Sequence, residues 1–436
     1  MSSKRSRALV VLAMIALPGV ACQAIVGIHD HDFTVPAAEA SAVDAFVEAS
    51  AEAAPARCPV GNVPPTKPDR PDDSVMRSFT FAVSRTSLRG TDATGAAVGF
   101  DIDDVCTCDP RDDSVHAGGL SCVLPAAPYR AGACDEDGGI DDALGGALVQ
   151  VEKFASVFGF PSADEAVNLD IGCGRHTVLY TLEGYNGLAD DPVVTVTGYQ
   201  TVGIHELADG GADGDGGFAG DASACPPYDG GAPYPPQFDG NDRWSVATDS
   251  TSVHTVFGYV KDFRLVVDGR ASTNGVQDTV LAVRFYSKVV AIVTPVLVAR
   301  LVPLGATGQE LIADGMGRLP EPATSFRLTD GILAGRASAS AVLTAVGALR
   351  IGPDALCDPA NRGLYCQARD IVCRSVDTMT QPNLDFGGQP CDALSVVLQF
   401  EALTAVNAGS RGADPPGTGC TLAFTDDCAG GDAGCP

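Results

Sequence analysis

Hydrophobic and polar residues alternate with a period of two in several stretches of the chain. Phe79, Phe81 and Val83 are apolar, and the residues between them are Thr or Ala. The same alternation, rich in Val, Thr and Leu, recurs at 98–103, 177–182, 193–202 and 394–402. A period of two puts successive side chains on opposite faces of a strand, so these stretches predict half-buried β-strands.

A longer apolar run occupies residues 280–302. Its length would suit a membrane-spanning helix, but it contains Arg284, Lys288 and Arg300 as well as Pro295. Charged residues are strongly disfavoured at the centre of a membrane helix, and proline is confined to strand edges, ends and bulges. We therefore predict two buried strands joined at a turn.

Three stretches instead repeat their apolar residues every three or four positions, which is the spacing of an amphipathic helix. They are residues 140–158, 342–349 and 364–372. The first is predicted to cover a sheet, and the other two form a short helical insert. The sequence thus predicts a mainly β protein that carries a few helices.

The composition varies along the chain and suggests where its domains begin and end. With 436 residues and 45% hydrophobic residues, it can build a substantial core. Residues 208–242 are rich in Gly, Asp and Pro, which is typical of a linker, and residues 408–436 form a Gly-rich tail that carries cysteines. We predict two disulfide-braced, β-sandwich-like domains with short helical inserts, at 75–207 and 243–407.

The first residues have the three parts of a secretory signal: basic residues, an apolar run at 8–17, and small residues before Cys22. Ten apolar residues are too few to span a bilayer, which takes about 20. Residues 1–21 are therefore predicted to be a signal peptide. Residues 22–74 are mostly Ala, Glu, Asp and Pro, with few large apolar side chains, which predicts a flexible tether.

The charge balance bears on possible partners. The formal net charge is -27. Nucleic-acid binding depends on Lys and Arg side chains that release counterions from the phosphates, so nucleic acid is not expected as a partner. Acidity of this kind is typical of a protein that must stay soluble outside the cell.

Fifteen cysteines in an exported chain favour disulfides, because bridges persist outside the cytoplasm. Zinc-thiolate sites are disfavoured, since the cysteine spacings are irregular. Setting Cys22 aside leaves an even number. The residues predicted to form disulfides are Cys58, Cys106, Cys108, Cys122, Cys134, Cys173, Cys225, Cys357, Cys366, Cys373, Cys391, Cys420, Cys428 and Cys435.

These cysteines fall in two odd groups of seven, one on each side of Trp244. If all of them are oxidised within one chain, at least one bridge must cross between the two halves. We predict that Cys225 forms this bridge with Cys420, Cys428 or Cys435, because both partners lie in Gly-rich stretches that can meet the geometry of a disulfide.

No catalytic residue can be assigned from local motifs, since the chain has no Gly-x-Ser-x-Gly elbow, Ser-x-x-Lys or His-Glu-x-x-His. Oxygen-rich clusters occur at 101–104, 135–142 and 186–191. Solvated loops explain such clusters most simply. If they bind a ligand, we expect calcium, because it takes six to eight oxygen ligands. The calcium candidates are Asp101, Asp103, Asp135, Asp137, Asp141, Asn186 and Asp190.

Pro-Gly-Val-Ala-Cys22, the following Ile-Val-Gly-Ile28, the tether and the Cys-rich, Asp-Gly-rich domains resemble uncharacterised outer-membrane lipoproteins of Gram-negative bacteria. The resemblance implies that Cys22 is acylated. It also implies an outer-membrane destination, because Gln23 is not the Asp that retains such proteins in the inner membrane. Ordinary signal cleavage after Ala21 would instead give a periplasmic or secreted protein.

These observations together predict a lipid-anchored cell-envelope protein with a non-enzymatic binding or structural role. Its expected partners are the membrane, through the lipid, and an extracellular protein or polysaccharide. One alternative is a secreted polysaccharide hydrolase, whose carboxylate pair would leave no sequence signature. Another is a calcium-dependent adhesin or lectin, although aromatic residues make up only 6% of the chain. Calcium is the only cofactor left open.

Overall fold

The computed structural model describes residues 63–70, 77–92, 94–105, 121–124, 135–136, 139–156, 162–204, 225, 235–247, 253–271, 280–285, 288–351, 354–410, 426, 428 and 435. All of them belong to one compact unit, Ala54–Pro436. The predicted signal peptide, Cys22 and most of the predicted tether lie outside the described residues. So do Asp137, Cys58, Cys106, Cys108, Cys134 and Cys420.

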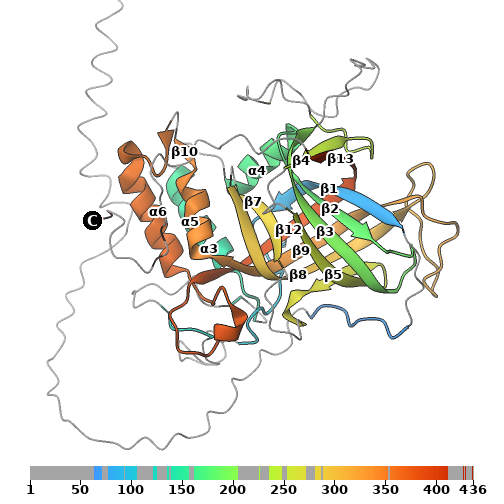
Figure 1. Ribbon diagram of the computed structural model, residues 1–436, viewed down its shortest axis with the longest axis horizontal. Helices are drawn as coiled ribbons and strands as arrows, with labels where there is room; N and C mark the ends of the chain where they lie inside the picture. Colours follow the sequence, from blue (N-terminus) through green and yellow to red (C-terminus); the bar gives the residue numbers. More distant parts are fainter. Residues whose placement is uncertain are drawn as a thin grey trace, which may run out of the picture. The chain divides into compact units, whose positions relative to one another are not determined.

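The protein is mainly β, and its central sheet closes on itself (Figure 1). Eight antiparallel strands form the closed part, each pairing with the next: β1 (Ser78–Ser87), β2 (Val178–Glu183), β3 (Asp191–Ile204), β5 (Val253–Lys261), β6 (Arg264–Asp268), β8 (Lys288–Leu304), β9 (Ser325–Ser338) and β12 (Ala393–Thr404). The last strand, β12, pairs with β1 and completes the ring.

Three further strands extend this sheet. They are β7 (Val280–Phe285), which pairs with β8, β4 (Arg243–Val246), which pairs with β3, and β13 (Val406–Ser410), which runs parallel to β4. Two short strands, β10 (Arg350–Ile351) and β11 (Asp354–Ala355), pair separately.

Alternate positions along the strands belong to different hydrophobic clusters, as the period of two requires. Phe81 and Tyr180 contribute to the main core. Their neighbours Ala82 and Leu179 instead pack with Trp244, which is 0% exposed. The sheet therefore buries side chains on both of its faces.

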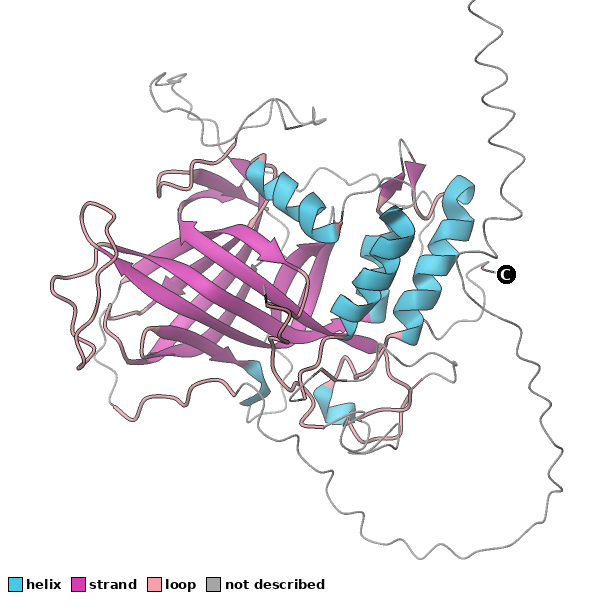
Figure 2. Ribbon diagram, turned by 180° about the vertical axis from the view of Figure 1, so that it is seen from behind, coloured by secondary structure: helices cyan, strands magenta, loops and turns pink. Residues whose placement is uncertain are grey.

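The helices lie mainly at one end of the sheet, where α3, α5 and α6 gather in both views (Figures 1 and 2). Their bounds are α3 (Ala143–Ser156), α4 (Ala163–Gly172), α5 (Ala339–Gly347) and α6 (Arg362–Arg374), with 3-10 turns η3 (Gly269–Ala271), η4 (Pro359–Asn361) and η5 (Pro382–Leu384). The Ser338 hydroxyl accepts a hydrogen bond from the Ala341 amide at 3.2 Å and so caps α5. No helix among the described residues is long and apolar enough to cross a membrane.

Most predicted strands are confirmed, but the one predicted at 98–103 is wrong. This segment forms no strand, although Phe100 and Ile102 are buried. They pack against Val397 of β12, so the alternation reflects a segment that lies on the sheet rather than in it. The two strands predicted within 280–302 are β7 and β8.

The prediction of two neighbouring strands is confirmed, since β7 and β8 pair antiparallel from Phe285 and Lys288 onward. Pro295 does not lie between them. β7 ends at Phe285 and β8 begins at Lys288, whereas Pro295 lies inside β8. The register of β8 against β9 shifts between Val293 and Val296, which is the irregularity that allows a proline within a strand.

Two separate β-sandwich domains are not confirmed. Strands from 75–207 and from 243–407 share one closed sheet, and β1 of the first region pairs directly with β12 of the second. Period-two patterns show which strand faces are buried. They do not show which strand is the neighbour, and this is why the sequence suggested two sheets.

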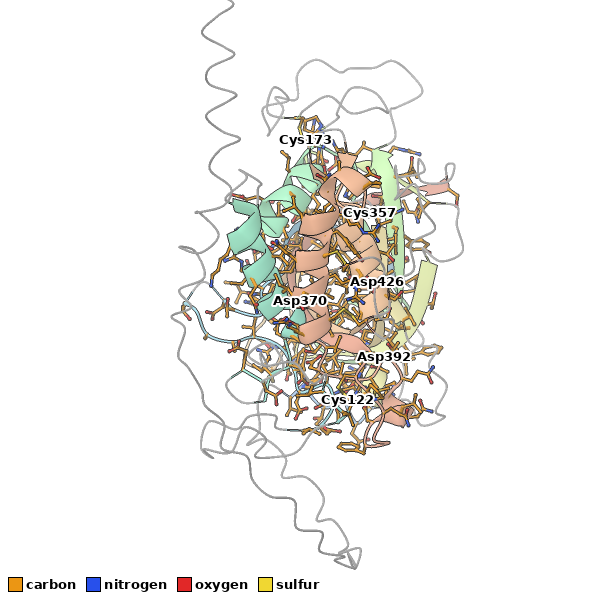
Figure 3. All side chains as sticks on the ribbon, turned by 90° about the vertical axis from the view of Figure 1, so that its left-hand side faces the viewer. Cys122, Cys173, Cys357, Asp370, Asp392 and Asp426 are labelled. Atoms are coloured by element: carbon orange, nitrogen blue, oxygen red, sulfur yellow. A yellow bond between two sulfur atoms is a disulfide. The ribbon has the colours of Figure 1, made fainter. Side chains whose placement is uncertain are left out.

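The structure contains the disulfides Cys122–Cys391, Cys173–Cys225, Cys366–Cys435 and Cys373–Cys428, and Cys357 is also disulfide-bonded. The bridges brace distant parts of the protein, since Cys173 and Cys122 lie at opposite ends of the view in Figure 3. A bridge between the two halves exists, but its predicted identity was wrong: Cys225 pairs with Cys173, and Cys122–Cys391 makes the crossing.

Candidate functional site

A layer of chain covers the face of β8, β9 and β12 that points away from the main core. Phe100 and Ile102 pack there against Val296 and Val397. Residues 121–124 lie next to this layer, because the Ser121 hydroxyl acts on Asp103, while Cys122 and Leu124 belong to the main core. They are joined to residues 386–391 by the Cys122–Cys391 disulfide and by backbone hydrogen bonds such as Phe386 N to Ser121 O at 2.6 Å. Buried polar side chains lie between this cover and the sheet.

Arg336 of β9 is the central cation of this layer. Only 2% of its side chain is exposed, and it binds both carboxylate oxygens of Asp385, at 2.8 and 2.6 Å. It also donates hydrogen bonds to the carbonyl oxygens of Met379, at 3.0 Å, and Ile102, at 3.2 Å. One guanidinium group therefore ties the sheet to Ile102 of the covering segment and to the segment that contains Met379 and Asp385.

Three carboxylates from two separate segments of the chain meet beside this guanidinium. Oxygen atoms of Asp101, Asp103 and Asp141 all lie within 4.8 Å of one another. Asp141 lies two residues before α3, and it accepts a hydrogen bond from the Ile102 amide at 2.6 Å. Asp103 accepts one from the Val105 amide at 3.0 Å. The covering segment and the start of α3 thus form one acidic cluster.

Burial makes negative charge costly in this cluster. Desolvation and repulsion from Asp103 raise the pKa of Asp101 to about 6. Desolvation likewise raises the pKa of Asp103 to about 6, against the opposing effects of the Ser121 hydroxyl and Arg336. The pKa of Asp141 lies well above its usual value, because of burial and repulsion by neighbouring carboxylates that include Asp103. The cluster is therefore stabilised by protons or by a bound cation.

A fourth carboxylate, Asp377, connects the cluster to β12. It accepts hydrogen bonds from the amide, at 2.8 Å, and the hydroxyl of Ser395. The Ser395 hydroxyl oxygen accepts in turn from the Ala143 amide, at 2.9 Å, at the beginning of α3. Burial raises the pKa of Asp377 to about 7, and repulsion from Asp103 adds to the effect.

The predicted calcium candidates are thus divided by the fold. Asp101, Asp103 and Asp141 come together, and Asp135 lies near enough to Asp141 to raise its pKa further. Asn186 and Asp190 do not belong to this group: they build the connection between β2 and β3. The Asn186 side chain bonds backbone atoms of that turn, and Asp190 forms an ion pair with Lys261 at 3.1 Å.

Sequence reasoning missed Ser121, Arg336, Asp377 and Asp385. Only Arg336 could have been recognised from its sequence context. It follows Leu333-Ala-Gly and precedes Ala-Ser338, so it is a single charged residue among small and apolar residues of a strand. A buried charge requires a partner, and this pattern alone would have suggested a polar layer against that strand. The other three residues have no comparable local signal.

The described residues also line a small apolar cavity of about 50 Å³. Its walls include Val83, Ile171, Tyr180, Phe400 and His176. No carboxylate lies among the described residues of this lining. Its lining therefore offers no carboxylate pair for hydrolysis.

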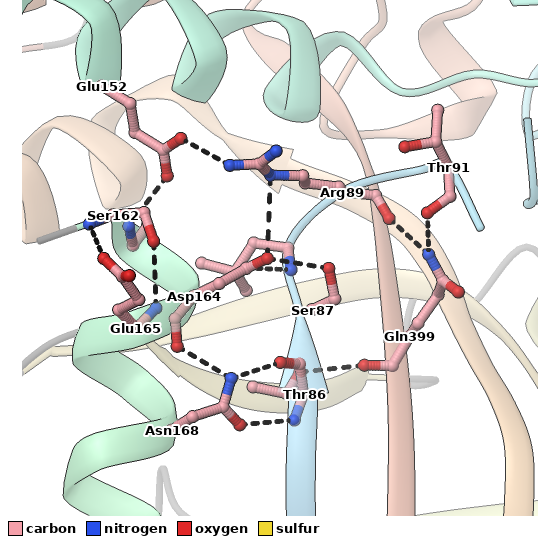
Figure 4. Close-up of polar contacts among 12 residues, drawn as sticks. Thr86, Ser87, Arg89, Thr91, Glu152, Ser162, Asp164, Glu165, Asn168 and Gln399 are labelled. Carbon is pink, nitrogen blue, oxygen red and sulfur yellow. Dashed lines mark hydrogen bonds and ion pairs between the residues drawn. The ribbon is translucent and has the colours of Figure 1, made fainter. Parts of the chain in front are cut away.

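Polar side chains of α4 fix that helix to the end of β1 near this cavity (Figure 4). The Asn168 side chain accepts a hydrogen bond from the Thr86 amide at 2.9 Å and donates to the Thr86 carbonyl at 2.7 Å. Asp164 accepts from the Leu88 amide at 2.6 Å. Pairing of β1 with β2 ends at Ala82. Beyond that point the side chains of α4 take the place of the neighbouring strand and form hydrogen bonds with the backbone N–H and C=O groups of β1.

Comparison of the chain with protein-family models, curated proteins and solved structures gives no match.

Proposed function

We propose that the chain is a lipid-anchored protein of the cell envelope with a non-enzymatic binding or structural role. The observation that carries this proposal is the set of disulfides, in particular Cys122–Cys391, which connects residues 269 positions apart. Such bridges persist in oxidising compartments and are rare in the cytoplasm, which supports export. The lipobox-like residues before Cys22 supply the anchor in this proposal.

The position of the acidic residues supports binding or structure over hydrolysis. A glycoside hydrolase needs two carboxylates that face a substrate. Asp103 and Asp141 are instead buried between a covering segment and the sheet. The described cavity is apolar and small. A polysaccharide hydrolase is therefore the weaker candidate.

The location is tested by expressing the full precursor in a Gram-negative host with radiolabelled palmitate. The wild type is expected to be labelled and to fractionate with the outer membrane, and Cys22→Ser is expected to lose both properties. Labelling that survives Cys22→Ser would reject the lipid anchor.

The non-enzymatic role is tested separately on purified mature protein. No reducing sugar is expected to be released from a panel of bacterial and plant polysaccharides. Hydrolysis that disappears in Asp103→Asn or Asp141→Asn would favour the hydrolase instead.

A further inference from the structure

We propose that Asp101, Asp103 and Asp141, together with the hydroxyl of Ser121, bind a hard divalent cation of the calcium class. This inference goes beyond the proposed envelope role and does not depend on it, because it concerns a site inside the folded unit. In this proposal the cation holds the covering layer to the sheet.

The geometry of the three carboxylates suits one shared ion. Calcium binds oxygen ligands at about 2.3 to 2.6 Å, so two of its ligands can be at most about 5 Å apart. The oxygens of Asp101, Asp103 and Asp141 lie within 4.8 Å of one another. Three oxygens at this spacing can therefore approach one shared ion through small side-chain movements.

A second, independent observation comes from two buried oxygens that form no well-aligned hydrogen bond with the described residues. Ser121 is only 1% exposed and lies beside Asp103, yet its Oγ has no hydrogen-bond partner of acceptable geometry among the described residues. Oδ1 of Asp101 is also buried and likewise forms no hydrogen bond with the described residues. The large majority of buried side-chain polar atoms in proteins have a partner, so two such oxygens at one place point to a ligand that is not protein.

The charge balance favours a cation as that ligand. Two guanidinium groups act on the cluster: Arg336 on Asp103 and Arg270 on Asp101. Each is already paired with both oxygens of another carboxylate, Arg336 with Asp385 and Arg270 with Asp268. The three clustered carboxylates therefore keep an excess of negative charge. A site made only of carboxylate and hydroxyl oxygens suits calcium better than zinc, which prefers nitrogen and sulfur ligands.

The ligands come from separate pieces of chain, and this defines the role of the ion. Asp101 and Asp103 belong to one covering segment, and Asp141 lies at the beginning of α3. Ser121 belongs to the segment that Cys122 bridges to Cys391. A bound cation would join these pieces, and so it would raise the stability of the cover more than that of the sheet.

The test uses the mature chain, oxidised and freed of metal with a chelator. Titration calorimetry and thermal unfolding are then measured with CaCl₂ and, separately, with MgCl₂. One calcium ion per chain is expected to bind, with an increase in the unfolding temperature that EDTA reverses and that MgCl₂ reproduces only weakly, because magnesium demands tighter octahedral geometry. No heat of binding and no shift at millimolar CaCl₂ would overturn the proposal, and the cluster would then be neutralised by protons.

Two variants assign the binding to these residues. Asp101→Asn is expected to lower calcium affinity at least tenfold while the protein stays folded, because Asp101 is partly exposed and its Oδ1 supports no hydrogen bond among the described residues. Asp190→Asn is the matched control: it removes a carboxylate that the sequence also suggested for calcium, but one that pairs with Lys261. Calcium binding that is lost in Asp190→Asn and retained in Asp101→Asn would reject the site.

Discussion

Removing the Cys122–Cys391 bridge is expected to destabilise the protein more than removing any other bridge seen here. The double variant Cys122→Ala/Cys391→Ala opens a loop that spans a sequence separation of 269, whereas Cys173–Cys225 closes one of only 52. In the chain-entropy model these loops correspond to about 5 to 6 and about 4 kcal/mol of stabilisation. Measured values are often smaller, so we expect losses of about 3 to 5 kcal/mol and about 2 to 4 kcal/mol.

The assay is equilibrium unfolding in urea, followed by the fluorescence of Trp244. It is the only tryptophan in the chain, and it is 0% exposed in the folded state, so its emission reports loss of the core. Cys173→Ala/Cys225→Ala is the matched control. The dependence of the unfolding free energy on urea should also become steeper, because the opened chain exposes more surface when it unfolds. An equal or smaller loss than in the control would refute the argument from loop length.

Three further predictions concern buried polar groups. Arg336→Met is expected to lower the free energy of unfolding by about 3 to 5 kcal/mol, because it leaves Asp385 buried without its partner. The double variant Arg336→Met/Asp385→Asn should recover part of that loss in urea unfolding. No recovery would mean that the pair does not act as a unit. Burial raises the pKa of Asp142 to about 7, so the folded state holds a proton that the unfolded chain releases from about pH 4. The stability due to this proton is present at low pH and is lost as pH rises through 7. Between pH 5 and pH 8 the free energy of unfolding of the wild type should therefore fall by about 2 to 4 kcal/mol relative to that of Asp142→Asn. A difference between the two proteins that does not change with pH would contradict this pKa. Asn168→Leu should cost about 1 to 3 kcal/mol in thermal or urea unfolding, because both backbone groups of Thr86 lose their partner, and an unchanged stability would show that water replaces the amide.

The sequence predicted the elements better than their arrangement. The pattern around Phe81 located β1, and the pattern at 394–402 located β12. Nothing in either stretch indicated that the two strands pair, because each pattern records only which side chains are buried. Phe100 and Ile102 show the converse error, since a segment that packs on a sheet can alternate like a strand within one.

The candidate site was predictable in part for a similar reason. Asp101, Asp103 and Asp141 were recognised by their chemistry, but Asn186 and Asp190 had the same chemistry and fold into a different place. Residue type along a sequence gives the ligands a cation prefers, and only the fold gives the distances between them. Ser121 was missed because its significance depends entirely on burial without a partner.

The closure of the sheet also sets an order on folding. Phe81 of β1 lies opposite Thr404 of β12. Among the described strands, the first can therefore pair fully only after the last but one has been synthesised. Contacts between such distant residues form slowly, and until then β1 and β9 each present an open edge that can recruit another chain. Because Cys391 lies two residues before β12, its bridge to Cys122 holds the closing strand near its gap. A chain that ends before β12 would keep both edges open and should aggregate rather than merely lose stability.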